Sequence, residues 1–194
     1  MRLWTVQPYC VYEIIRTEGI YRCNPDLTPL LDSYEFINAY EWISNQMKKR
    51  IGNPPSQIKY PVWAWYIVEG KHNRPDMRKS GFKVSEKSVI FEIEIPDSEV
   101  LLTDFDNWHI VLNDGIYYKA SHIKSLSYEE WNLEADKEYD YYCSLSDKEQ
   151  LAYKEKSWEN IICYPNDILL PQFVQATFWE FKIDQIKKIW ILRK

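Results

Sequence analysis

The chain has 194 residues, of which 45% are hydrophobic and 27% charged, a balance that suits one globular domain and excludes an intrinsically disordered protein. Its net charge of −5 excludes a broadly basic nucleic-acid-binding protein, and its five glycines form neither a dinucleotide-binding nor a P-loop motif. The aromatic share is high at 16%, and Tyr and Trp suit ligand clefts and partner surfaces as well as cores.

The residues that follow Met1 lack the charged and apolar regions of a secretory signal. No run of about 18 apolar residues predicts a transmembrane helix. The four cysteines have neither C-x-x-C nor zinc-finger spacing, which predicts reduced thiols. We therefore expect a cytoplasmic protein with no membrane partner.

The first part of the chain predicts a strand and two helices. Residues 3–7 read as a short strand, and the helix after it ends at Gly19. Asp32 and Glu35 form a capping box for a second helix over 33–51. Apolar side chains recur in this helix every three or four residues, which predicts one face against the core.

The middle of the chain predicts two strands on either side of a basic loop. Residues 60–68, "YPVWAWYIV", form a short aromatic run that favours a strand. The loop at 71–83 carries five basic residues and one acidic residue, so it fits a small anionic ligand or a solvated surface. Residues 88–96 alternate apolar side chains with Glu92 and Glu94, which predicts a half-buried strand with both glutamates toward solvent.

The stretch "LLTDFDNWHIVLN" (101–113) brings Asp104 and His109 close together, as in a metal site or an acid/base pair. A metal site needs a third ligand at this locus, and the sequence offers none. Thr103 or Asp104 suits a helix N-cap instead, with Trp108 turned toward the core and His109 on another side. We therefore interpret the stretch as a capped piece of scaffold, and we expect no metal ion.

Two helices and two strands complete the predicted elements. Each helix begins with a Ser-x-x-Glu capping box, at 127–130 and at 146–149. The second helix is expected to turn Leu151 toward the core. Residues 173–183 and 186–192 read as strands.

Strands at both ends of the chain, with helices between them, predict an α+β fold. The elements do not form a regular βαβ series, which disfavours a doubly wound sheet. No repeat, low-complexity tract or linker divides the sequence. We therefore expect a single globular domain over residues 1–194, with a mixed or antiparallel sheet and several flanking helices.

Several stretches together resemble a family of uncharacterised bacterial proteins of this size that begin with "LWT" and are known as a domain of unknown function. The resemblance covers nearly the whole chain, and its most specific part is the middle block. The stretches that carry it are "LWTVQ", "YPVWAW", "IFEIEIPDSEVLLTDFDNWHIVLN", "KSWENI" and "VQATFWEFKIDQI".

A more distant resemblance concerns the order of the elements. An N-terminal strand, a helix closed by Gly19 and the ending "VQATFWEFKIDQIKKIWIL" are similar to the beginning and end of the ADP-ribosyltransferase fold. The resemblance implies a cleft that binds NAD and transfers its ADP-ribose to a macromolecule or nucleotide, in a bacterial toxin or phage-defence setting. The family pattern has Arg or His in the first strand, Tyr or Ser/Thr in a middle strand and Glu in a late strand.

Matching positions in this chain give the candidate site. The resemblance implies that Gln175 and Glu180 are the catalytic residues, although strand alternation places them on opposite faces. Aromatic side chains can stack on a base, and arginine matches a phosphate bidentately. The residues expected to contact NAD are Arg2, Thr5, Trp65, Tyr66, Arg74 and Arg78.

Each of these residues also has an alternative role as scaffold, and three functions stay open. The first is an NAD-dependent ADP-ribosyltransferase, and the second is a non-catalytic module that binds a nucleotide or a nucleic-acid end. The third is a protein-interaction element, similar to an antitoxin, that uses the acidic region 129–159. The first two require Thr5, Tyr66 and Gln175 to converge in one pocket, with the 71–83 loop at its mouth.

Overall fold

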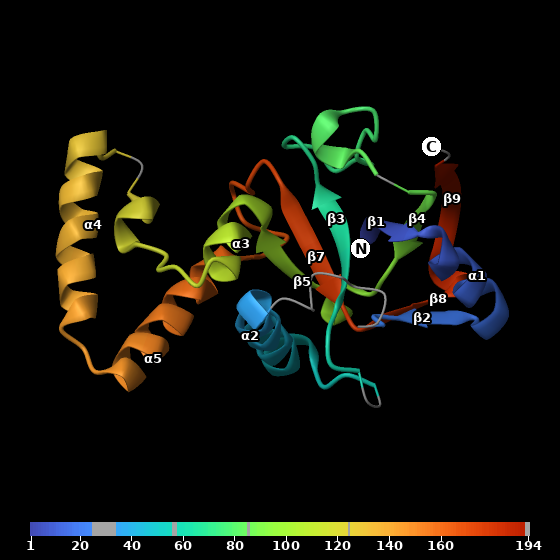
Figure 1. Cartoon of the computed structure of the whole chain (residues 1–194). Coiled ribbons are helices and arrows are strands. Elements are labelled where there is room, and N and C mark those ends of the chain that lie inside the picture. Colours follow the sequence, from blue (N-terminus) through green and yellow to red (C-terminus); the bar gives the residue numbers. More distant parts are fainter. Residues whose placement is uncertain (25–33, 56–57, 85, 124, 193–194) are drawn as a thin grey trace.

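The framework of the protein, in a computed structural model that describes residues 1–24, 34–55, 58–84, 86–123 and 125–192, is an antiparallel sheet (Figure 1). Every neighbouring pair of its strands runs antiparallel, which confirms the predicted α+β class and excludes a mixed sheet. In spatial order the strands are β6 (Ile162–Cys163), β5 (Leu101–Asp104), β7 (Val174–Phe178), β3 (Val62–Ile67), β1 (Arg2–Pro8), β4 (Ser88–Glu94) and β9 (Ile186–Leu192).

A second, two-stranded sheet pairs two short strands antiparallel, and helices cover the main sheet. The small sheet lies beside the first helix in Figure 1, and the remaining helices lie on the other side of the main sheet. The small sheet consists of β2 (Ile20–Arg22) and β8 (Glu180–Lys182), and the helices are α1 (Tyr9–Glu18), α2 (Tyr34–Ile51), α3 (Phe105–Leu112), α4 (Tyr128–Cys143) and α5 (Asp147–Trp158).

Helix α1 begins and ends where the sequence predicts. Pro8 precedes its first turn with φ −54°, and Gly19 closes it in the left-handed conformation with φ +75°. The Gly19 N–H donates to the Ile15 carbonyl at 3.0 Å, which satisfies a carbonyl at the helix end.

Residues that are paired across the strands show which side chains share a face. Thr103, Gln175, Trp65, Trp4 and Glu92 are paired in succession from β5 to β4, so they form one row on the same face of the sheet. Neighbouring positions along each strand point to the opposite face.

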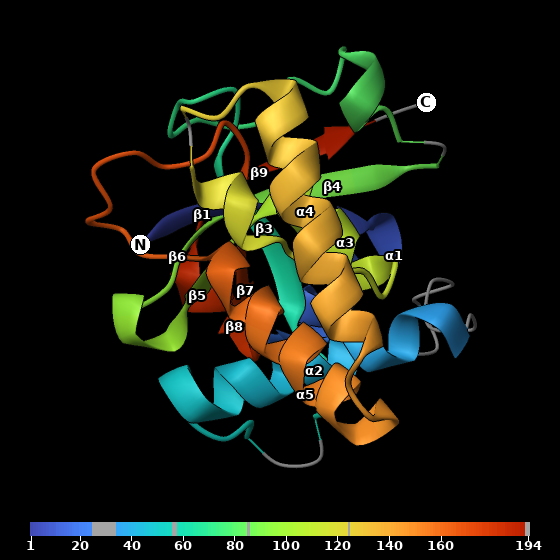
Figure 2. The ribbon, with the colours of Figure 1, turned by 90° about the vertical axis from the view of Figure 1, so that its left-hand side faces the viewer.

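Each face of the sheet covers its own apolar core. The first core lies against α1 and the small sheet and includes Leu3, Phe91 and Phe181. The second core lies between the sheet and α2, α3 and α5, and includes Trp108 and Trp158. Figure 2 shows α4 and α5 in front of the sheet, and α4 packs against α5 and the turn that precedes it rather than on the sheet.

Helices α4 and α5 begin at the capping residues that the sequence predicts. The Ser127 hydroxyl accepts from the Glu130 N–H at 3.3 Å, and the Glu130 carboxylate accepts from the Ser127 N–H at 2.8 Å, which confirms that box. The Glu149 carboxylate accepts from the Ser146 N–H at 3.0 Å, as predicted. The predicted box at Asp32 lies outside the described residues.

Three predictions about burial and strand length are wrong. Glu92 is only 7% exposed, because β4 lies between β1 and β9 rather than against solvent. Leu151 is exposed on α5 and does not reach the core. The predicted strand at 173–183 is two strands in two different sheets, separated at Trp179.

No helix within the described ranges is both long enough and apolar enough to cross a membrane.

Candidate functional site

The main sheet splits between β1 and β3, and the split opens a cleft of about 360 Å³. The two strands are paired at Trp4 and Trp65, a register that would set Val6 opposite Trp63. The described residues of the two strands are not paired at any other position. We call the opening the central cleft, and its lining residues are Val6, Gln7, Tyr21, Cys23, Tyr40, Pro61, Val62, Trp63, Phe105, Trp108, His109, Leu112 and Gln175.

One wall of the central cleft is aromatic. The ring centroids of Trp63 and Trp108 lie 5.1 Å apart, and the Tyr40 ring meets both at about 6 Å, edge to face. Burial raises the pKa of Tyr40 to about 12, so its phenol is neutral throughout the physiological range. Three rings packed against one another in this way form a stiff aromatic wall, against which a planar ligand can pack.

A chain of hydrogen bonds fixes the side chain of Gln7 beside this wall. The Thr5 hydroxyl donates to the Trp63 carbonyl at 2.8 Å and accepts from Gln7 Nε2 at 2.7 Å. Nε2 is held by this bond, and Gln7 Oε1, which makes no hydrogen bond with a residue in the described ranges, is a positioned acceptor. Thr5 itself is fully buried and reaches the cleft only through Gln7.

Polar groups with open hydrogen-bonding capacity gather around Gln175. Its amide makes no hydrogen bond with any residue that the structure describes, and Thr103 lies opposite it on β5. Within the same residues, Thr103 Oγ1 and Trp63 Nε1 are buried without a partner. Trp42 Nε1 is a third such atom, so we base the inference of a polar ligand on the Gln175 amide, which lines the cleft itself.

His109 also lines the central cleft, whereas the sequence predicts it as part of a capped scaffold. Asp104 caps α3 through the Asn107 N–H at 3.1 Å, as predicted, and this fixes the rotation of the helix. His109 Nδ1 lies 3.1 Å from the Phe105 carbonyl. Since a carbonyl only accepts, the proton of the neutral ring is on Nδ1, and Nε2 is left as an acceptor.

The residues that the sequence assigned to one site are only partly brought together. Gln175 lines the central cleft. Thr5 does not line it, but its hydroxyl holds the side chain of Gln7, which does. Trp65 packs beside the cleft against Phe105, at 5.0 Å between ring centroids. Tyr66 lies where the β3–β7 register shifts, between Trp65 and Ile67, and its ring meets His72 at 4.7 Å. It is not among the residues that line the cleft with Gln175.

Glu180 lies in a different sheet from Gln175. Its carboxylate accepts from Arg22 Nε at 2.8 Å within the small sheet, away from the central cleft. The chain leaves the main sheet at Trp179, whose indole donates to the Gly52 carbonyl at 3.0 Å. The two candidate catalytic residues therefore have separate surroundings.

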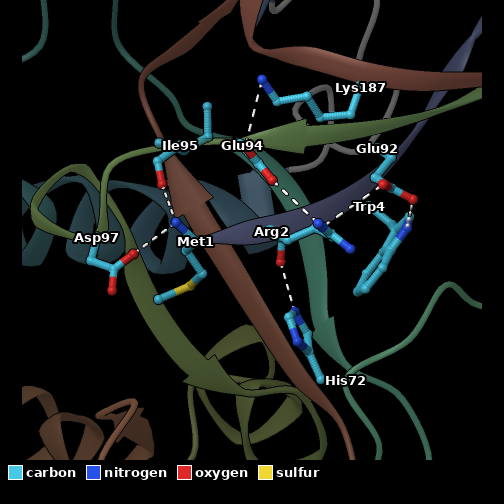
Figure 3. Close-up of polar contacts among 9 residues, drawn as sticks. All are labelled: Met1, Arg2, Trp4, His72, Glu92, Glu94, Ile95, Asp97 and Lys187. Carbon is cyan, nitrogen blue, oxygen red and sulfur yellow. Dashed lines mark hydrogen bonds and ion pairs between the residues drawn. The ribbon is translucent and has the colours of Figure 1, made fainter.

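Arg2 and Arg74 meet at a second, more open space of about 500 Å³, which we call the outer hollow. In Figure 3, Arg2 lies between two carboxylates, with Nη2 3.4 Å from Glu94 and Nε 3.8 Å from Glu92. Trp4 Nε1 donates to Glu92 at 3.2 Å. The lining residues are Arg2, Trp4, His72, Asn73, Arg74, Glu92, Glu94 and Trp190.

The basic loop contributes to the outer hollow, not to the central cleft. A tight turn starts it, with positive φ at Glu69 and Gly70 between the bridged residues Val68 and Lys71. The Arg74 guanidinium then lies 4.5 Å above the ring of Trp190.

Arg78 lies outside both spaces. Its Nη2 is 2.7 Å from the carboxylate of Asp76 on the surface of the loop. This hydrogen bond lowers the pKa of the Asp76 carboxyl well below its usual range. Arg78 is therefore occupied by its neighbour rather than directed at a shared ligand.

The family of the chain follows from one comparison. A family model described as a domain of unknown function, DUF3841, matches residues 2–187. The chain belongs to this family. No curated protein and no solved structure matches it. The predicted membership of a domain of unknown function is confirmed, and the resemblance to ADP-ribosyltransferases stays a prediction.

All residues that line the central cleft fall within the part matched by the DUF3841 model. Among the described residues, the lining has amides, aromatic rings and one imidazole, and it includes no Asp, Glu, Lys or Arg. No group of three or more His, Cys, Asp or Glu side chains in the described ranges is arranged to hold a metal ion. Such a cleft offers stacking and neutral hydrogen bonds rather than charge.

Proposed function

We propose that the central cleft binds the planar ring of a nucleotide-type ligand, a nicotinamide or a nucleobase, and holds it without transferring it. The observation that carries the proposal is that two glutamines, Gln7 and Gln175, line one cleft together with the packed rings of Trp63 and Trp108. The aromatic wall supplies the stacking surface, and the amides supply orientation.

The chemistry of such a ring matches the groups in the cleft. A nucleobase edge or a nicotinamide carboxamide presents both N–H donors and C=O acceptors. Gln7 Oε1 accepts, whereas the Gln175 amide both donates and accepts. Stacking a base on an aromatic side chain contributes about 1–3 kcal/mol, enough to anchor a ring that the amides then orient.

Binding without transfer is favoured over ADP-ribosyl transfer by the charges at the site. Cleavage of the nicotinamide–ribose bond develops positive charge on the ribose, which a nearby carboxylate stabilises. Glu180 is engaged with Arg22 in the small sheet, and no carboxylate stands among the described lining residues. NAD remains a candidate ligand in this proposal, as a bound molecule rather than a substrate.

The test is thermal unfolding of the full chain with increasing NAD, alongside chromatographic detection of free nicotinamide. We expect a saturable rise in Tm, since a ligand that binds only the folded state stabilises it by mass action. Gln175→Ala should lose most of the rise, and Glu180→Gln should keep it. Free nicotinamide should not accumulate.

Two results would count against the proposal. If millimolar NAD, AMP and nicotinamide mononucleotide all leave the Tm of the wild-type protein unchanged, the cleft does not bind nucleotides. If nicotinamide accumulates with the wild type and not with Gln175→Ala, the protein is a transferase or hydrolase, and binding without turnover is wrong.

A further inference from the structure

Strand β9 leaves one edge of the main sheet open. It has seven residues and pairs with β4 on one side, while no other strand of the described chain pairs with it. The opposite edge of the sheet, β6, has only two residues. A long edge strand presents a row of backbone N–H and C=O groups to which another strand can add.

The side chains of β9 make this edge apolar on one face. Ile189 and Ile191 are paired with Phe91 and Val89 of β4, which are completely buried in the first core. The two isoleucines are nevertheless 43% and 44% exposed. The first core therefore ends at β9 with two half-covered β-branched side chains, which a further strand would cover.

We propose that a second copy of this chain pairs antiparallel along β9 and joins the two main sheets into one. Such a pair has a twofold axis perpendicular to the sheet, so each residue faces a residue whose side chain lies on the same face. Ile189 and Ile191 lie two residues apart on one face of β9, so across such an axis each can cover the other's counterpart, and this favours a second copy as the partner.

The sequence of β9 selects the register of this pairing. An axis at Lys188 would oppose two lysines, which is destabilising, and an axis at Ile189 would set Ile191 opposite the charged Lys187 of the other copy. An axis at Trp190 instead sets Ile189 opposite the partner's Ile191 twice, and Lys188 opposite the partner's Leu192. Lys187 is drawn away from the edge by Glu94, at 3.5 Å.

The register also connects the edge with the outer hollow. Trp190 lines that hollow, beneath the guanidinium of Arg74. With the axis at Trp190, the outer hollows of the two copies adjoin across it, and each tryptophan contributes to a shared surface. The dimer is independent of the ligand proposed for the central cleft.

Sedimentation equilibrium with charge-swapped variants tests the dimer and its register together. We expect wild type to dimerise, and Ile189→Glu and Ile191→Lys to be monomeric when each is alone, because each homodimer would bury two unpaired charges. An equimolar mixture of the two variants should regain a dimer, since the introduced carboxylate faces the introduced ammonium across the axis.

Ile183→Glu is the matched control, because Ile183 is 49% exposed and lies outside β9. It should dimerise as wild type does, and circular dichroism should show all variants folded. A wild type that stays monomeric at every concentration overturns the proposal. So does a dimer that both β9 variants leave intact, and a mixture that fails to dimerise overturns the register.

Discussion

The hydroxyl of Thr5 joins β1 to β3 at the point where the main sheet splits, through its bonds to the Trp63 carbonyl and to Gln7. Thr5→Val keeps the shape of the side chain but leaves that carbonyl and the Gln7 amide without this partner. We expect the free energy of unfolding in urea to fall by about 1–3 kcal/mol, the usual cost of an unsatisfied buried group.

The control for this substitution is Thr17→Val on the exposed surface of α1, which should change stability by less than about 0.5 kcal/mol. Equal effects of the two substitutions would show that the Thr5 hydroxyl does not hold the split sheet.

Tyr40 gives the protein a pH dependence on the alkaline side. Burial is the main reason that its pKa is raised from 10.0 to about 12, so the folded state disfavours the phenolate. The stabilisation is fully present below pH 10 and is lost as pH rises through 12, because the unfolded chain releases its proton first. We expect Tyr40→Phe to reduce the loss of stability over this window by up to about 3 kcal/mol.

Burial also raises the pKa of Tyr21 to about 12. The Tyr40→Phe protein should therefore still lose part of its stability at alkaline pH. Tyr128→Phe is the control, because Tyr128 is exposed on α4. Urea unfolding at a series of pH values gives the comparison. If Tyr40→Phe leaves the fall of the unfolding free energy with pH unchanged, Tyr40 is not the source of the alkaline loss.

At the residue scale, the sequence identified part of the central cleft. Gln175 and Thr5 were named through the resemblance to ADP-ribosyltransferases. Gln7 was not named, because strand alternation places it with Thr5 on the face opposite to Gln175, and it lines the cleft only because β1 and β3 part there. His109 was placed correctly on the side of α3 away from the core. The sequence carries no signal that this side of α3 meets the split between β1 and β3, because that contact joins distant segments.

At the scale of elements, Gly19 ends α1 with φ +75°, and a Cβ there would meet no atom within 4 Å. Gly19→Ala should therefore cost about 1 kcal/mol from backbone strain alone. Gly81→Ala is the matched control, because its surroundings are equally open and its φ is not in the left-handed region. Comparable unfolding midpoints for the two variants in urea would contradict this explanation.

Helices and strand positions were predictable because their signals are local: capping boxes, a closing glycine and period-two alternation. Burial of β4 was not, because alternation cannot distinguish an edge strand from a central one. Glu92 is covered by Trp4, its direct partner on β1, and by Arg2, and both come from the beginning of the chain. The break at Trp179 likewise depends on its bond to Gly52, 127 residues earlier in the chain.

At the scale of the whole molecule, the sheet order β6-β5-β7-β3-β1-β4-β9 brings together strands from both ends of the chain. The α+β class followed from the sequence, whereas this order did not, since pairing between distant strands leaves no periodic pattern. The order sets β1 beside β3, where the central cleft lies, and leaves β9 at an edge.

The central claim is that a planar ligand binds at the aromatic wall of the central cleft. The nitrogen-15 spectrum of the nine tryptophan indoles, assigned by single substitutions, tests it most directly. On titration with NAD, the account predicts saturable shifts for Trp63 and Trp108, with Trp4 and Trp190 of the outer hollow unmoved. Shifts confined to Trp4 and Trp190, or no shift at millimolar NAD, would contradict it.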